Sequence, residues 1–550
     1  MSEQAAVRLL PLGGIGQFGG NCLLIQDTLS QQAIVVDCGI RFLHDDEAPG
    51  FDFALPQFDA LEELGEHFLG YIITHGHLDH IGALPFFYPK APKPIYATRF
   101  TSQLISRRMK EHRIDADINE VTILETAHIG PFKIQWVSVN HSIPDATLLL
   151  IETPAGRLIH SGDFRNEQDP LVGPPTDLET VRRFSKDGTL CLIADSTSVS
   201  RDGPSAGERA VIPALAEIFQ GAPGRLVLTT FSNHIQRMAA VLELCERFDR
   251  YLCFIGRSML RNVDLARAGN MLPHAHRIIS TSQLNGYLPR QVCVLMTGCQ
   301  GEPNGSIGRL ARQHLPQLHL EPSDRVVFSS RAIPGNERAI AATMDAFSSQ
   351  GVQCYDGSKN RHVSGHGSWE DLRQLIEAAQ PANFVAAHGG HTQLLSHRIR
   401  VEAQGKSIED TSVKPFVSPR IVALQNGQEA HLRPDDTPTI QDVPEAHVVY
   451  TQGLHHTHQG PRIAQVRSRM KHAGVLVVWN ENGTWRLITR GLPPGFSSKD
   501  RLHLCHLAQN CLSETSEEHQ ERFISRARKY FRVLRIDCPE VIIAQETPKP

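Results

Sequence analysis

Short apolar runs separated by glycine, proline and aspartate turns fill roughly the first 200 residues, a pattern of many short strands. One helical stretch, 101–112, interrupts them. Strands with few helices predict layered sheets covered by helices. The runs that we expect to be strands are 7–10, 22–25, 33–36, 134–137, 147–151 and 190–193.

The pattern changes near Asp202-Gly203-Pro204. Helix-like runs at 207–218 and 235–248 then alternate with buried strands, a β-α-β rhythm that predicts a mostly parallel sheet. Those strands are 226–230, 251–255, 292–296 and 325–329. A last unit begins after Pro444 and combines helices and strands. Its expected strands are 475–479, 485–489 and 541–544, and its expected helices are 500–512 and 517–533.

The glycines of Gly14-Ile15-Gly16-Gln17-Phe18-Gly19 satisfy the spacing of a dinucleotide-binding loop, and Asp37 follows where a ribose-binding acid would. Such a site needs a helix that starts within the glycine motif. Here 21–25 reads as another strand. We therefore expect a hairpin and no nucleotide site.

Composition narrows the class of protein. The 550 residues, 41% hydrophobic and 21% charged, suggest three or four units of an ordinary globular protein. Since no apolar run reaches 18 residues and no signal sequence opens the chain, we expect neither a membrane span nor export, and the cytoplasm is the default. Eleven cysteines without a C-x-x-C pair argue against disulfides and cysteine zinc sites. A net charge of -4 leaves any nucleic-acid contact to local basic patches.

The densest chemistry lies in Thr74-His75-Gly76-His77-Leu78-Asp79-His80, directly after the apolar run 68–73. A buried strand that ends in a ligand loop is a rigid support for a metal site. Imidazole and carboxylate together suit zinc or a similar divalent ion. Four ligands so close in sequence cannot all reach one ion without strain, so the spacing hints at two metals. A polar loop with chance histidines is the alternative.

Further metal-capable side chains follow strands elsewhere. His141 follows the strand that ends at Val139, Asp163 follows 158–160, and His388 follows 383–385. A lone histidine at a strand end is more often structural. Together with the loop at 74–80, however, these positions form a pattern.

These residues resemble the metallo-β-lactamase superfamily. By that resemblance, His75, His77 and His141 would hold one zinc, Asp79, His80 and His388 the other, and Asp163 would bridge them. Manganese is possible in place of zinc. The bridging water would then be a hydroxide near neutral pH, because two cations lower its pKa. The fold implied is an αββα sandwich within the α/β class.

The unit spliced between Asp163 and His388 resembles the β-CASP domain of nucleic-acid-processing members. Its markers are Asp195 (motif A), His366 in His362-Val363-Ser364-Gly365-His366 (motif B) and His388 (motif C). The resemblance implies that His366, held by Asp195, protonates the leaving 3′ oxygen; a polar loop residue is the alternative reading of His366. We place the first part of the metallo-β-lactamase domain at 1–204, the β-CASP domain at 205–355, the second part at 356–445, and a linker with a small C-terminal α/β domain at 446–550.

Within that group the chain resembles the bacterial ribonuclease J family over nearly its whole length. The strings that carry the resemblance are Leu12-Gly13-Gly14-Ile15-Gly16, Asp37-Cys38-Gly39, 75–83, 141–145, 256–259, 297–303, 329–337 and 362–366. It implies a zinc-dependent ribonuclease, both 5′-to-3′ exonuclease and endonuclease, that gives 5′-phosphate products in RNA maturation and decay. Asp79, His366 and Asp195 would be its catalytic residues.

The same resemblance implies single-stranded RNA with a 5′ monophosphate as substrate and a homodimer or homotetramer. A phosphate pocket needs donors and positive charge. The candidates are Ser329, Ser330, His362, Ser364 and Arg257, for which ordinary turn chemistry is the alternative. Arg107, Arg108 and Lys110 could meet the RNA backbone, or simply form a solvated helix face.

Three positions depart from the family pattern: Gln17 and Gly390 stand where glutamate is usual, and Ser198 where asparagine is usual. They leave open the tuning of rate and metal preference. A histidine loop, His455, His456 and His458, is an extra metal contact or an exposed loop. The alternatives for function are a catalytically weak RNA-binding paralogue, a thioester or lactam hydrolase, and a DNA-directed nuclease on the same fold.

Overall fold

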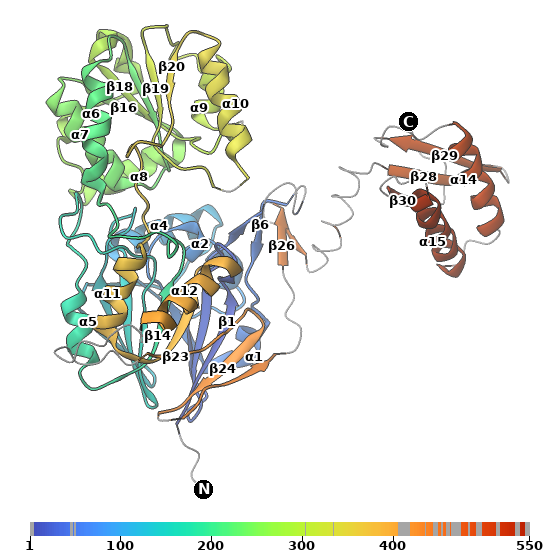
Figure 1. The fold of residues 1–550 in the computed structure, drawn as a ribbon, viewed down its shortest axis with the longest axis horizontal. Coiled ribbons are helices and arrows are strands. Elements are labelled where there is room, and N and C mark those ends of the chain that lie inside the picture. The colour runs from blue at the N-terminus through green and yellow to red at the C-terminus, as the bar shows by residue number, and fades with distance from the viewer. Residues whose placement is uncertain are drawn as a thin grey trace. The chain divides into compact units, whose positions relative to one another are not determined.

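The chain divides into two compact units, Met1–Arg41 with Pro56–Ala446, and Phe42–Leu55 with His447–Pro550. Figure 1 shows the computed structural model. It describes residues 5–544 apart from 44–47, 49–50, 303, 334, 405–417, 435, 444–448, 453–454, 458–462, 464–474, 482–483, 491–497, 513–516 and 534–538.

The first unit begins with an eight-stranded sheet of order β25-β24-β1-β3-β4-β7-β8-β9. The apolar runs of its central strands are buried on both faces, as β4 illustrates. The strands are β1 (Val7–Gly13), β3 (Cys22–Asp27), β4 (Ala33–Val36), β7 (Phe68–Ile72), β8 (Ile95–Thr98), β9 (Ile118–Val121), β24 (Gln428–Leu432) and β25 (Thr439–Asp442). β1 and β3 pair antiparallel, so the glycine-rich segment between them forms a hairpin and no helix, as predicted.

A seven-stranded sheet of order β10-β11-β12-β13-β14-β21-β23 faces the first. Its strands are β10 (Thr126–Ile129), β11 (Phe132–Ser138), β12 (Thr147–Thr153), β13 (Gly156–His160), β14 (Thr189–Asp195), β21 (Pro381–Ala387) and β23 (Arg420–Ile421). Side chains of both sheets, among them Val36 and Trp136, share one hydrophobic core. β14 and β21 pair in parallel with Asp195 opposite Ala387, which brings the segments before and after the inserted domain together.

Helices flank the two sheets (Figure 1). α5 contacts α11, which contacts β14, while α4 contacts β8 and β9 and α12 contacts β21. The helices are α1 (Asp59–Leu64), η1 (Gly65–His67), α2 (Leu78–Ile81), α3 (Leu84–Phe87), α4 (Arg99–Glu111), α5 (Leu178–Ser185), α11 (Trp369–Ala379) and α12 (His391–Gln404). A two-stranded sheet, β2 (Ile15–Gly16) with β22 (Gly389–Gly390), completes this part.

The inserted domain is a parallel six-stranded sheet of order β17-β16-β18-β15-β19-β20 with its own core. Its strands are β15 (Leu226–Thr229), β16 (Tyr251–Ile255), β17 (Ile278–Ile279), β18 (Val292–Met296), β19 (Arg325–Phe328) and β20 (Gln353–Tyr355). Its helices are η2 (Glu208–Ala210), α6 (Val211–Gln220), α7 (Ile235–Arg247), α8 (Arg257–Ala268), η3 (Ala275–Arg277), η4 (Thr281–Gly286), η5 (Pro289–Gln291), α9 (Ser306–Ala311) and α10 (Glu337–Ser348).

The second unit contains β6 (Phe53–Leu55) paired with β26 (Val449–Gln452), and β26 paired with β27 (His455–Thr457). β5 (Arg41–Phe42) lies where the chain passes from the first unit into the second. A three-stranded sheet of β28 (Val475–Glu481), β29 (Thr484–Arg490) and β30 (Glu540–Ala544) shares a core with α14 (Ser498–Cys511) and α15 (Glu517–Val533).

The structure confirms the fold class, an α/β sandwich with an inserted α/β domain and a small C-terminal α/β domain. The predicted strands and helices are present, with ends shifted by a few residues. The grouping of 42–55 with the C-terminal unit was not predicted. The predicted boundary at 445/446 and His458 lie outside the described residues, as do the side chains of His455 and His456. Among the described residues, no helix has both the length and the apolar character to span a membrane.

Candidate metal centre

The loop at 75–80 is held by the backbone just before β3 and the backbone that follows β4. The carbonyl oxygens of Leu78, Asp79 and His80 accept hydrogen bonds from the backbone amides of Ile40, Asn21 and Cys38. Gly39 makes this approach possible, because an added Cβ there would lie 1.6 Å from the Asp79 carbonyl oxygen. The short helix α2 then buries His80, while Asp79 in its first turn stays partly exposed. The loop is therefore a rigid part of the sheet edge.

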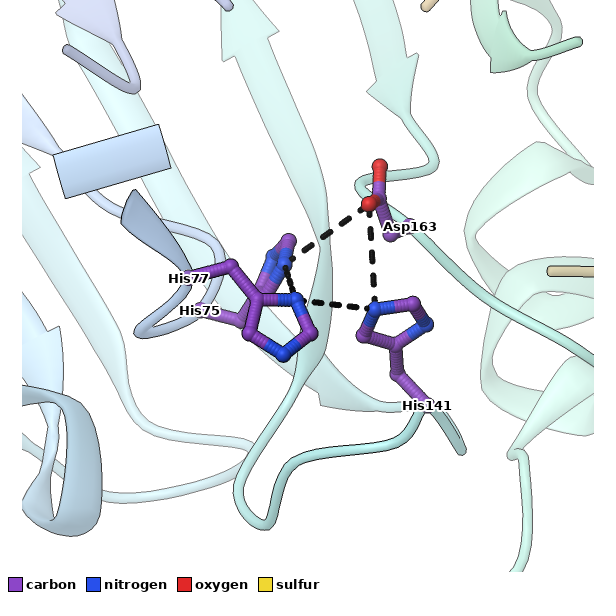
Figure 2. Close-up of side chains that lie close together, drawn as sticks. All are labelled: His75, His77, His141 and Asp163. Atoms are coloured by element: carbon purple, nitrogen blue, oxygen red, sulfur yellow. Dashed lines mark hydrogen bonds and ion pairs between the residues drawn. The ribbon is translucent and has the colours of Figure 1, made fainter. Parts of the chain in front are cut away.

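The structure brings His75, His77, His141 and Asp163 together, with one ligand atom from each within 4.8 Å of the others. Figure 2 shows their side chains converging, with His75 and His77 on one loop and His141 and Asp163 on two others. His77 Nδ1 lies 3.1 Å from His75 Nε2 and 3.0 Å from His141 Nε2. Asp163 Oδ2 lies 3.7 Å from His75 Nε2 and 3.8 Å from His141 Nε2. These separations suit four atoms around one small cation.

A second group contains Asp79, His80, Asp163 and His388. His80 Nε2 lies 3.3 Å from Asp163 Oδ2, and His388 Nε2 lies 3.4 Å from Asp79 Oδ2. Asp163 is common to both groups, and its buried Oδ1 has no hydrogen-bond donor, although His388 Nδ1 lies 3.1 Å away. A buried carboxylate oxygen without a donor fits a cation as its missing partner. The donor set thus fits two divalent ions that share Asp163.

Neighbouring groups orient the imidazole rings by occupying the nitrogen that faces away from the cluster. His75 Nδ1 lies 3.0 Å from Thr74 Oγ1, and His141 Nδ1 lies 2.8 Å from the Gly365 carbonyl oxygen. Such outer contacts fix the ring and its tautomer.

Asp37 does the same for His80, since its Oδ2 lies 2.7 Å from His80 Nδ1. Its other oxygen accepts the Thr74 backbone amide at 2.8 Å. Asp37 and His388 both have positive φ, 60° and 49°, a conformation that costs free energy outside glycine and collects at functional sites.

Burial and charge set the protonation of the cluster. Burial lowers the pKa of His77 to about 4 and takes those of His75 and His141 well below the ordinary value, so these rings are neutral and able to bind metal. Burial also opposes charge on His80 and His388, but nearby carboxylates, Asp163 foremost, raise the pKa of both well above normal. The carboxylates of the second group thus favour positive charge close to them, which a bound cation would supply.

His366 lies beside these two groups, and with Asp163, Asp195 and His388 it forms a third group whose potential ligand atoms lie within 4.8 Å of one another. Its Nδ1 lies 2.8 Å from Asp195 Oδ2 and 3.8 Å from Asp163 Oδ2. Burial lowers the pKa of His366, but the carboxylates of Asp195 and Asp163 outweigh it, and the pKa lies above the ordinary value. Asp195 is in turn fixed by Thr197, whose amide and hydroxyl both donate to Oδ1. The arrangement can supply a proton beside the two metal groups.

The five expected phosphate-binding residues lie in three separate segments. His362 and Ser364 lie in the segment before His366, and Ser329 and Ser330 follow β19. The Ser329 hydroxyl already donates to the Arg361 carbonyl oxygen at 2.7 Å. His362 Nδ1 is buried without a hydrogen-bond partner. Arg257 starts α8 with an exposed side chain, and among the described residues it makes no hydrogen bond or ion pair to this segment.

The departures from the family pattern leave the metal groups intact. Gln17 bridges to Gly389, and its side-chain amide donates to the Gly19 carbonyl oxygen at 3.4 Å. A Cβ at Gly390 would lie 3.6 Å from the ring of Phe18. Ser198 Oγ lies 3.2 Å from Ser364 Oγ, so this serine links the motif A loop to the motif B segment.

Sequence reasoning missed two buried arginines, Arg165 and Arg237, and their partners Glu167 and Glu208. The available signal was weak: Arg237 stands in the apolar helical run 235–248, where a charged residue needs a buried partner. The sequence could not name that partner.

Comparison with known proteins assigns the family. Residues 15–196 match the metallo-beta-lactamase superfamily, and residues 223–347 match "Ribonuclease J, beta-CASP domain". A crystal structure of a protein of unknown function from Enterococcus faecalis, 14% identical, aligns with a TM-score of 0.54 over 78% of this chain and 100% of that one, which shows the fold alone.

Curated relatives named Ribonuclease J give longer matches. The protein of Sinorhizobium meliloti is 34% identical over 82% of this chain and 78% of its own length. That of Corynebacterium glutamicum is 31% identical over 95% and 73%. That of Helicobacter pylori (strain B128) is 32% identical over 72% of this chain and 58% of its own length. With both domains matched and these identities sustained over most of both chains, the chain belongs to the ribonuclease J family.

Proposed function

We propose that this protein is a metal-dependent ribonuclease that hydrolyses RNA phosphodiesters. The observation that carries the proposal is the pair of ligand groups that share Asp163, with the His366–Asp195 pair at their edge. Two adjacent cation sites beside a proton donor are the equipment of phosphodiester hydrolysis. The ribonuclease J relatives direct that chemistry to RNA.

The residues that would hold the metals are His75, His77 and His141 for one ion, Asp79, His80 and His388 for the other, and Asp163 for both. Nitrogen with oxygen ligands suits zinc first, and manganese is compatible. When bound, such a pair of ions activates a water and stabilises the charge that develops on the phosphoryl group. Asp37, Thr74 and the Gly365 carbonyl keep the histidines oriented for that purpose.

His366 would protonate the leaving 3′ oxygen. Its Nδ1 is occupied by Asp195, so Nε2 is the nitrogen that can give a proton to a substrate. The negative charge of Asp195 keeps the ring protonated until the proton is needed, and it holds the ring in one orientation. The product chain that receives the water oxygen would carry a 5′ phosphate.

We further propose 5′-to-3′ exonuclease and endonuclease activity on single-stranded RNA, with preference for a 5′ monophosphate. His362, with its unpartnered buried Nδ1, and Ser330 are the side chains best suited to a terminal phosphate. Backbone contacts carry little base information, so sequence preference should be weak. Arg107 and Arg108 are already bonded to Asn262 and to the Gly82 carbonyl, which favours a structural role for them. A homodimer or homotetramer is proposed from the family resemblance.

The test is a cleavage assay with metal-stripped protein to which zinc or manganese is returned. The substrates are one single-stranded RNA with a 5′ monophosphate, the same RNA with a 5′ hydroxyl, and the DNA of the same sequence. We expect metal-dependent cleavage of RNA, fastest with the monophosphate, and 5′-phosphate products. Metal binding without cleavage, unchanged by His77→Ala, would indicate an RNA-binding scaffold. Equal cleavage of DNA would indicate a nuclease without a sugar preference.

A further inference from the structure

The segment 361–366, which carries His366, has no helix or strand of its own. Three of its backbone carbonyl groups are nevertheless hydrogen-bonded. Those of Arg361, Ser364 and Gly365 accept hydrogen bonds from side chains of other segments. Gly365 lies so close to His141 that an added Cβ would be 2.7 Å from the ring. The position of His366 therefore depends on side chains outside the segment.

Arg165 holds one end of the segment. Its guanidinium is fully buried, forms an ion pair with Glu167, and donates from Nη1 to the Ser364 carbonyl oxygen at 2.8 Å. The backbone amide of Arg165 donates to the Asn140 carbonyl oxygen, next to His141. Arg165 thus ties the loop that carries Asp163 to the segment that carries His366.

Arg237 holds the other end from within the inserted domain. It is fully buried on α7 and forms an ion pair with Glu208, which is also fully buried. Its Nη1 donates to the Ser329 carbonyl oxygen at 2.7 Å and to the Arg361 carbonyl oxygen at 3.2 Å. Glu208 joins the two arginine pairs, because its amide donates to Glu167 Oε1 at 2.8 Å.

Buried ion pairs are poor stabilisers, since removing two charges from water costs about as much as their attraction returns. Two such ion pairs side by side therefore suggest a role other than stabilising the fold. An arginine fork offers several donors in a fixed plane, which suits it to hold carbonyl groups at defined positions. Catalytic groups need such support, because a 1 Å displacement can cost about a hundredfold in rate.

We propose that Arg165 and Arg237 are positioning residues that hold the 361–366 segment so that His366 can reach the leaving oxygen. This inference rests on the proposed function. It adds that the inserted domain, through α7, contributes directly to the placement of the proton donor. Neither arginine needs to touch the substrate for this role.

The test uses the full-length protein and two RNAs that differ at a single linkage, where the bridging 3′ oxygen is retained or replaced by sulfur. A thiolate leaves without protonation, so a defect in proton donation slows the oxygen linkage and spares the sulfur linkage. His366→Ala sets the scale for this discrimination. The test variants are Arg237→Lys and the paired replacement Arg237→Met with Glu208→Met, which leaves no unpaired buried charge. Arg250→Met is the matched control, a buried arginine that holds carbonyl groups of Gly224, Ala222 and Val292 elsewhere in the same domain.

For the paired variant we expect kcat on the oxygen linkage to fall about 10- to 100-fold, with KM, metal content and the rate on the sulfur linkage close to wild type. Arg237→Lys should give a smaller loss of the same kind and decides the matter if the paired variant does not fold. Arg250→Met should not discriminate between the linkages. Equal slowing of both linkages by the Arg237 variants, while His366→Ala discriminates, would overturn the inference alone. A wild-type protein that cleaves neither linkage would overturn the proposed function, and the inference with it.

Discussion

Asp195→Asn isolates the electrostatic part of the His366–Asp195 pair. The substitution keeps the size of the side chain and removes its charge from a contact of 2.8 Å in a buried setting. A hydrogen bond to a charged partner contributes about 1.5–3 kcal/mol. At about 1.36 kcal/mol per tenfold change in rate, kcat should fall about 10- to 150-fold.

The pH dependence should change in a defined direction. His366 acts in its protonated form, so its contribution is present below its pKa and is lost as pH rises through that pKa. Asp195 is a main reason that this pKa lies above the ordinary value. Without the carboxylate the pKa falls, and the alkaline decline of kcat should move to lower pH.

The assay is single-turnover cleavage of 5′-monophosphorylated RNA across the neutral and mildly alkaline range, with metal content measured on the same samples. Asp324→Asn is the control, a fully buried aspartate at the start of β19, at the opposite end of that strand from Ser329. It should leave the pH profile unchanged. If Asp195→Asn keeps both metals and shows an unshifted alkaline limb, the assigned role of the pair is wrong.

Three further outcomes are expected. Asp163→Ala should lose at least one of two bound metals, measured by elemental analysis, and all cleavage, because both groups share this carboxylate; full metal content would contradict the ligand assignment. His362→Ala should abolish the preference for a 5′ monophosphate over a 5′ hydroxyl. If the ratio of kcat/KM on these two RNAs is unchanged, His362 does not bind the terminal phosphate. Asp177→Ala should lower the free energy of unfolding by about 1 kcal/mol in denaturant melts, because Asp177 caps α5. Burial raises the pKa of Asp177, but hydrogen bonds from Thr180 outweigh it and lower the pKa. The difference in unfolding free energy between wild type and variant should therefore be present near neutral pH and vanish in acid. A difference that persists in acid would contradict this role of the Asp177 carboxylate.

Local sequence patterns predicted most of the fold because buried strands are apolar along their length. Runs such as 33–36 and 292–296 are apolar throughout, and both are buried strands. The association of 42–55 with the C-terminal unit has no corresponding local pattern. It depends on pairing between β6 and β26, which are distant along the chain. The sequence of a short strand does not show which other strand it pairs with.

The candidate site divides in the same way. His75, His77, Asp79 and His80 share one loop, so their grouping could be expected from spacing alone. His141, Asp163 and His388 were candidates from their positions after strands, and the family resemblance then assigned each of them to a metal. The outer contacts escaped prediction, because an ordinary aspartate such as Asp37 acquires its role only from the ring that it happens to face.

The order of the ligands along the chain has a consequence for the protein's synthesis. Asp163 follows β13 before the inserted domain and His388 follows β21 after it, and β14, which pairs in parallel with both strands, brings their segments together. A ribosome must therefore release the entire insertion before the centre can close, and this long-range contact forms late. A nuclease made in this order holds an incomplete centre while its own messenger RNA is being read close by.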